Sequence, residues 1–306
     1  MTDDNAAAAP QTLLDDGWAY HDTQSERLAR ELEAAAQADV GADALVPFLH
    51  LSTHTIGEHL GDWPRALSLG KRVLDGRTPT VETAKAWGRL QVAAVLAGDS
   101  IEAAQLELAC LNAAGNKFGA AVLDMRFMLI GALVASKRVA EAAQLYGSAV
   151  ALVATIPAAD FLDRTLAAVS NNLGWELFEM NPRSPDLDGV MRRCADTSLT
   201  FWRKCGNWIN EERALYFRAR VANALGDRAS ALADADQALA VIAAHGQRPL
   251  DAALLHLTRA SALAAGGDAG GASRAVADAD AAASTLTAPD LQAQFAAERA
   301  KVLAAV

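Results

Sequence analysis

Aromatic residues make up only 6 % of the 306 residues, and no run of alternating β-branched residues bounded by turn pairs occurs. Without such runs, β-strands are not expected. Cysteine is also scarce: Cys110, Cys194 and Cys205 form no C-x-x-C pair, and their number is odd. This favours a reduced, cytoplasmic protein over a disulfide framework.

Positive charge is scarce as well. The formal net charge is −10, and no run of Lys and Arg is longer than two. Such a chain repels phosphates, so neither nucleic acid nor an anionic membrane is an expected partner. The first residues are acidic, unlike a signal peptide, and no apolar run approaches the roughly 20 residues that span a bilayer. Residues 1–12 are expected to be a disordered tail.

Motifs of catalysis and nucleotide binding are missing. Neither G-x-S-x-G nor G-x-x-x-x-G-K-[ST] occurs, and the glycine cluster at 264–273 follows no predicted strand. The sequence therefore indicates no catalytic residue and no cofactor.

What the sequence has in abundance is alanine, close to a quarter of the chain. Alanine favours helices and lets them approach closely, so an all-α fold is expected. A turn, usually Gly-Asp, recurs at Gly61, Gly98, Lys137, Gly226 and Gly267, with separations of 37, 39, 89 and 41 residues. The double-length gap predicts a sixth turn near Asn181.

Small residues recur at fixed places after these turns. A small residue stands five positions after each turn, and a small or apolar one stands seven positions later. The first set is Ala66, Ala103, Ala142, Ala231 and Ala272, and the second is Val73, Cys110, Ala149, Ala238 and Ala279. The spacing places both on one helix face. The repeating unit is therefore helix, tight turn, helix.

Helix starts can also be read. Ser184 and Pro185 are expected to cap and open a helix, and prolines follow Thr78, Arg248 and Ala288 in predicted first turns. The "TQSE" of 23–26 predicts a capping box. These signals predict one domain over 13–306, with terminal helices at 24–39 and 288–304 around repeats at about 45–285.

The segment "ALYFRARVANALGDRASALADADQAL" (214–239) resembles the tetratricopeptide repeat (TPR) family, in the divergent form of bacterial sensors and regulators. The resemblance implies a right-handed superhelical solenoid of about six TPR-like repeats. The chain departs from the family in its period, 37 to 45 residues where 34 is usual, and lacks the proline that commonly ends the unit.

In the family, the first helix of each pair lines a concave face. Mapping it here gives a ligand-like set of aromatic, arginine and asparagine side chains: Asn171, Trp175, Phe178, Arg213, Tyr216, Arg220 and Asn223. Arginine and asparagine can hold carboxylates and backbone, while the aromatic rings give rigid contact area. The alternative is that the arginines pair with Glu211, Glu212 or Asp227 and bind nothing.

Three of the six histidines lie within residues 50–59. His50, His54 and Glu58, spaced i, i+4, i+8, share one face of an α-helix, and His59 falls on an adjoining face. By repeat register, His50 and His54 occupy packing positions, so we expect structural imidazoles and no metal. A zinc site would need further ligands, for which Cys110 is the nearest cysteine.

These features predict a non-catalytic protein or peptide-binding scaffold or sensor module, acting through the concave face. An enzyme or small-molecule-binding protein with an apolar pocket near Trp175 and Trp202 is one alternative. A structural protein that assembles as a homodimer is another.

Overall fold

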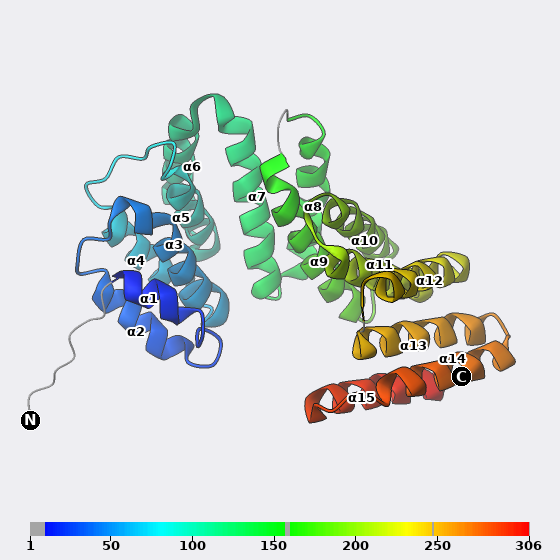
Figure 1. The fold of residues 1–306 in the computed structure, drawn as a ribbon. Helices are drawn as coiled ribbons and strands as arrows, with labels where there is room; N and C mark the ends of the chain where they lie inside the picture. Colours follow the sequence, from blue (N-terminus) through cyan, green and yellow to red (C-terminus); the bar gives the residue numbers. More distant parts are fainter. Residues whose placement is uncertain (1–9, 157–159, 247, 306) are drawn as a thin grey trace, which may run out of the picture. The chain divides into compact units, whose positions relative to one another are not determined.

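The computed structural model describes residues 10–156, 160–246 and 248–305, which form helices and turns with no strand among them (Figure 1). This confirms the all-α prediction. The helices group into two compact units, Met1–Ala159 and Asp160–Val306, and each is described on its own. One continuous array over 13–306 stays a prediction. Of the predicted tail 1–12, residues 1–9 lie outside the described residues, and 10–12 are helical.

Helices in the first unit are α1 (Pro10–Gly17), α2 (Ser25–Ala35), α3 (Ala42–Ser52), the π-helix η1 (Thr53–His59), α4 (Trp63–Leu74), α5 (Ala84–Ala97), α6 (Ser100–Ala114), the short 3-10 helix η2 (Gly115–Lys117), α7 (Phe118–Ala135) and α8 (Val139–Val153). Within it, α5 packs on α6 and α7 on α8.

The second unit contains the 3-10 helix η3 (Asp160–Leu162), α9 (Asp163–Glu179), α10 (Pro185–Cys205), α11 (Trp208–Ala224), α12 (Arg228–His245), α13 (Pro249–Ala265), α14 (Ala269–Ala283) and α15 (Pro289–Ala305). Its helices pack in pairs, α9 with α10, α11 with α12 and α13 with α14, and α15 packs on α13 and α14.

The tight turns follow from two adjacent residues. The five turn positions at which the repeat pattern recurs, including the non-glycine Lys137, have positive φ values of 58° to 83°. Four are glycines, which adopt this conformation without steric cost. The next residue in those four turns is an aspartate whose side chain accepts a hydrogen bond from the first turn of the following helix. Gly-Asp thus ends one helix and begins the next.

Small side chains bring the paired helices together. All ten residues at the two predicted small positions are buried, and the most exposed of them, Ala103, is 6 % exposed. Larger residues fill the cores beside them, including Phe48 and Ile56 in the first unit and Leu215 and Leu255 in the second. The spacing rule therefore identified core positions in both units.

Several predicted helix starts were right and two were wrong. Ser184 caps α10, with Pro185 in its first turn, and Pro249 and Pro289 open α13 and α15. Pro79 opens no helix, because the Thr83 hydroxyl accepts from the Thr80 N–H and holds a non-helical turn until Ala84.

The capping box at 23–26 does not form, and α2 is shorter than the predicted helix over 24–39. The Ser25 hydroxyl donates to the His21 carbonyl oxygen instead, so the chain stays in the preceding turn and the helix begins one residue late, after Gln24.

One helical stretch, 100–135, is long and apolar enough to span a membrane by length and composition, with 44 % of the tested window buried inside the protein. It consists of α6 and α7 with η2 between them. Core helices pass the same test, so the stretch is compatible with a soluble protein, and the cytoplasmic location stays a prediction.

Candidate functional site

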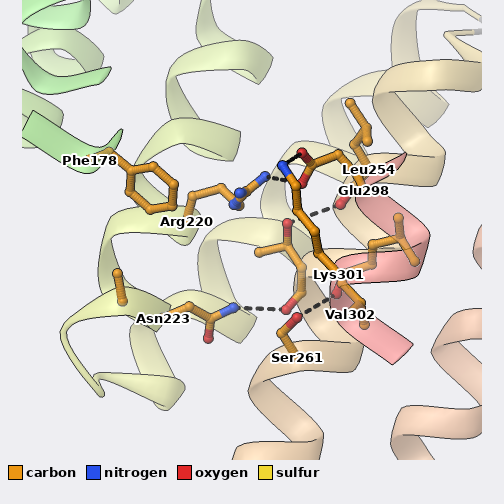
Figure 2. A pocket seen from close by; sticks show the side chains of 11 residues that line it. Phe178, Arg220, Asn223, Leu254, Ser261, Glu298, Lys301 and Val302 are labelled. Atoms are coloured by element: carbon orange, nitrogen blue, oxygen red, sulfur yellow. Dashed lines mark hydrogen bonds and ion pairs between the residues drawn. The ribbon is translucent and has the colours of Figure 1, made fainter. Parts of the chain in front are cut away.

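A groove lies on the second unit between α11, α13 and α15, with Phe178 of α9 at one end (Figure 2). It encloses about 280 Å³. Three of the seven residues predicted for the concave face line it, namely Phe178, Arg220 and Asn223. The structure therefore brings part of the predicted set together around one cavity.

The charged wall of the groove is formed by three side chains. Arg220 Nη1 lies 3.3 Å from Glu298 Oε2, and Lys301 Nζ lies 2.6 Å from Glu298 Oε1, so both cations meet at one carboxylate (Figure 2). Burial acts to raise the pKa of Glu298, but the hydrogen bond from Lys301 and the charge of Arg220 outweigh it and hold that pKa below its usual range. The wall carries two positive charges and one negative charge.

The rest of the lining is apolar with a few hydroxyl and amide groups. Leu254, Leu257 and Val302 form the apolar part. Asn223 Nδ2 donates to the Thr258 carbonyl oxygen at 2.9 Å, which ties α11 to α13 beneath the groove (Figure 2). This amide is committed to the backbone, so its role is to fix the groove's shape.

Aromatic rings support the arginine. The Arg220 guanidinium lies 5.0 Å from the centre of the Phe178 ring and 5.7 Å from that of Tyr216. Its Nη1 also donates to the Tyr216 hydroxyl oxygen at 2.6 Å. Trp175 packs on Tyr216 at 6.0 Å between ring centres. Cation–π contacts and the hydrogen bond together hold Arg220 in one orientation.

Two of the predicted residues lie outside this arrangement. Arg213 is 59 % exposed and pairs with Asp251 at 3.7 Å, and Asn171 donates to its neighbour Asn172. Neither lines the groove. The alternative that the arginines pair with Glu211, Glu212 or Asp227 named the wrong carboxylates, because Glu298 and Asp251 lie closer to them in the fold.

Sequence reasoning missed the contribution of α15. That helix was predicted as an end cap, yet it supplies Glu298, Lys301 and Val302 to the groove. The signal was present in the spacing of Glu298 and Lys301 on one helix face. The pairing of Glu298 with Arg220, 78 positions earlier in the chain, depends on the packing of α15 on α13.

A buried acid lies elsewhere on α11. Glu212 is 1 % exposed, and its Oε2 has no hydrogen-bond partner among the described residues. Burial, with the charge of Asp251 adding to it, raises the pKa of this carboxyl to about 7. It does not line the groove.

The predicted histidine face is arranged differently from an α-helix. His54 Nδ1 lies 2.6 Å from Glu58 Oε2, as the four-residue spacing predicts. His59 does not fall on an adjoining face, because residues 53–59 are a π-helix, and its Nε2 lies 3.1 Å from His54 Nε2. His21, which sequence reasoning did not consider, joins them: one ring nitrogen of each of the three histidines lies within 4.8 Å of the others.

His50 does not belong to that cluster. Its ring lies 6.3 Å from that of His54 and 5.0 Å from Trp18. Burial, with smaller contributions from Arg89 and His54, lowers the pKa of His50 to about 3. The imidazole is therefore neutral at neutral pH, in keeping with the predicted packing role. Burial and the nearby His54 also lower the pKa of His59.

Comparisons with known proteins assign no family. No protein-family model matches the chain, and no curated protein matches it. Among solved structures, the crystal structure of BtubC (BKLC) from P. vanneervenii aligns with a TM-score of 0.47 at 15 % identity, over 86 % of this chain and 92 % of that one. A likeness this loose carries no argument about fold family or function.

Proposed function

We propose that the chain is a non-catalytic binding module of TPR-like helical hairpins in a right-handed superhelix, and that the groove of the second unit binds a peptide. The recurring Gly-Asp turns and the buried small positions after them support the repeat assignment. Stacked hairpins present grooves between their first helices, which suits peptide recognition.

The observation that carries the proposal is the net positive charge of an apolar groove on an acidic protein. Arg220 and Lys301 exceed Glu298 by one charge, whereas the whole chain carries −10. Leucine and valine side chains form much of the remaining lining. A peptide with aliphatic side chains and one carboxylate complements both features.

The size of the groove favours a peptide segment over a cofactor. Small-molecule pockets usually enclose about 300–1,000 Å³. At about 280 Å³ this groove lies just below that range and fits one or two side chains. The rest of a peptide would lie along the helices at its rim.

The chemistry of the lining favours binding over catalysis. Both of its cations pair with Glu298, and the Glu298 pKa lies below its usual range, which disfavours a role as a general acid near neutral pH. The aromatic residues of the alternative enzyme pocket are used in packing: Trp175 contacts Phe217, and Arg164 lies over the Trp202 ring.

Fluorescence polarisation tests the proposal with a pool of labelled heptapeptides that have randomised aliphatic residues and a free C-terminal carboxylate. The same pool with amidated C-termini is the ligand control. We expect the wild-type chain to bind the carboxylate pool more tightly. Lys301→Glu changes the charge of the groove from +1 to −1 at a side chain that is 68 % exposed, and should weaken binding at least about tenfold.

Arg213→Glu is the matched control variant, because it makes the same charge change on an exposed side chain outside the groove. Its affinity should stay within about twofold of wild type. Equal losses in the two variants, or no preference for the free carboxylate, would refute the groove proposal. Self-association as a homodimer stays a separate prediction, checked by sedimentation across a concentration series.

A further inference from the structure

The first unit contains a cluster of three histidines whose ring nitrogens are close to the separations that a small metal ion needs. One ring nitrogen from each of His21, His54 and His59 lies within 4.8 Å of the other two. Zinc bound at 2.0–2.1 Å by tetrahedral nitrogen ligands places those nitrogens about 3.3 Å apart. The His54 and His59 Nε2 atoms are already 3.1 Å apart. Only His21 would have to move closer, by about 1.5 Å or less.

The Nδ1 hydrogen bonds of two rings leave a lone pair on each Nε2 atom. At His54 this lone pair accepts the hydrogen of His59 Nε2 at 3.1 Å, so a bound cation would replace that hydrogen. His21 Nδ1 lies 2.8 Å from the Trp18 carbonyl oxygen, and His54 Nδ1 lies 2.6 Å from the Glu58 carboxylate. Both partners are acceptors, so each Nδ1 carries the hydrogen and each Nε2 keeps its lone pair. A metal-binding histidine typically donates its other N–H to a carboxylate or carbonyl in this way.

The π-helix brings His54 and His59 together. In η1 the Leu60 N–H donates to the Thr55 carbonyl oxygen, five residues back. Residues five apart therefore lie above one another, whereas in an α-helix the i+5 residue points to a different side. The absence of a side chain at Gly57 allows the π-helix to pack closely on Trp63, because a Cβ at this position would lie 2.4 Å from the Trp63 ring. π-Helical turns are frequent at functional sites.

The surroundings suit a cation that is reachable from solvent. His59 is exposed, and His21 and His54 are partly buried, so an ion could enter without unfolding the unit. The Trp18 ring lies 5.1 Å from His21 and 5.3 Å from His54, and forms an apolar wall beside them. The Glu58 carboxylate adds a negative charge behind His54.

We propose that His21, His54 and His59 bind one divalent transition-metal ion, of which Zn²⁺ is the ion to test, with Glu58 as a positioning residue for His54. This departs from the expectation of no metal. The predicted helix face grouped His54 with His50 and Glu58, whereas the structure groups it with His59 and His21. Three imidazoles leave a fourth coordination position for water. Because His21 lies between α1 and α2, the ion would tie these helices to the π-helix.

Calorimetric titration of the chelator-treated full-length chain with Zn²⁺, followed by elemental analysis after dialysis, tests the proposal. We expect one ion per chain and a raised melting temperature. Mg²⁺ is the ion control, since it prefers oxygen ligands and should not compete. Absence of binding at about 100 µM Zn²⁺, or binding that Mg²⁺ displaces, would overturn the proposal.

Variants in two separate segments keep the test independent of folding defects. His59→Ala and His21→Ala should each weaken Zn²⁺ binding at least about hundredfold, since each leaves only two ligands. The matched control is His245→Ala, an exposed histidine of the second unit whose ring stacks on Trp208. It should bind as wild type does. Unchanged affinity in either cluster variant, with native circular dichroism, would refute the assignment.

Glu58→Gln tests the positioning role. It removes the carboxylate that receives the His54 N–H but leaves all three ligands, so affinity should fall about 10- to 100-fold while the stoichiometry stays at one. Glu58→Asp should recover part of the loss. Affinity equal to wild type in Glu58→Gln would remove Glu58 from the site.

Discussion

The helix that precedes the Gly-Asp turn at Gly61 and the helix that precedes the one at Gly226 have different side chains at matching positions. Counted back from Gly61, Glu58 and His59 stand where Asn223 and Ala224 stand before Gly226. In the second unit those positions line the groove. In the first, His59 belongs to the histidine cluster and the Glu58 carboxylate is hydrogen-bonded to His54 of that cluster. The position of a residue along the helix therefore determines whether it faces the groove or the cluster. The kinds of side chain there, and the α or π winding of the helix, determine what can bind.

The winding is the second difference. The helix before Gly61 changes from α to π at Thr53, while α11 stays α-helical to its end. Gly57, which packs on Trp63, is matched by Ala222 in α11. Substitutions in the two units change this comparison one position at a time, and urea-induced unfolding measures the stability of each variant.

The largest effect on stability is expected at Glu212, which stands as far before Gly226 as Pro47 of α3 stands before Gly61. Its pKa is about 7 in the folded chain against 4.5 for an ordinary glutamate. The unfolded chain therefore releases this proton at lower pH, and stability falls as pH rises from about 4.5 to about 7. At pH 8 the cost is about 3 kcal/mol.

Glu212→Gln should recover most of that loss at pH 8 and change little at pH 4, because glutamine does not ionise. The measurement is the free energy of unfolding at both pH values. A gain of equal size at both would show that packing, and not ionisation, distinguishes the variant.

Gly57→Ala places a methyl group against the Trp63 ring, where its nearest contact would be 2.4 Å. Overpacking of this kind typically costs about 1–3 kcal/mol. The control is Gly131→Ala in α7, where a Cβ meets nothing within 4 Å. Improved helix propensity should stabilise that variant by about 0.5–1 kcal/mol. If Gly57→Ala also stabilised the chain, that result would contradict the close packing of the π-helix on Trp63.

The reverse exchange, Ala222→Gly, removes a buried methyl group from α11. The lost helix propensity and the lost burial each contribute just under about 1 kcal/mol, so destabilisation of about 1–2 kcal/mol is expected. Peptide affinity should also decrease if the groove proposal is right, because Asn223 and Ala224 follow directly. An unchanged free energy of unfolding would mean that this helix position accepts glycine in both units.

The caps should behave alike in the two units, which makes them the smallest and most uniform test. Asp62 accepts from the Arg65 N–H at 3.1 Å, and Asp268 accepts from the Gly271 N–H at 2.8 Å. Substituting either by alanine should cost about 1 kcal/mol, and by asparagine much less. A loss confined to one unit would contradict a shared role for the Gly-Asp turn.

Sequence reasoning located the turns and the buried small positions because both depend on neighbouring residues. A glycine with positive φ and a capping aspartate act within one turn of helix, so their signal is local. The start of α5 at Ala84 was not predicted. A helix start was expected at Pro79, but the hydrogen bond to the Thr83 hydroxyl holds a non-helical turn there.

The sites were only partly predictable for the opposite reason. Phe178, Arg220 and Asn223 were found through the repeat register, but Glu298 and Lys301 come from a helix more than 70 positions away from Arg220. His59 was placed on the wrong face because the 3.6-residue period was applied to a π-helix. His21 lies outside any periodic segment, and only tertiary packing brings it to His54.

The π-helix has an evolutionary consequence. Its hydrogen-bonded turn holds one residue more than an α turn, so loss of a single codon within 53–56 would restore ordinary winding. If residue 55 or 56 were lost, His54 and His59 would become four residues apart, which in an α-helix is again one turn apart on the same face. A relative one residue shorter could therefore present the same pair of rings from an α turn, with the Gly-Asp turn intact.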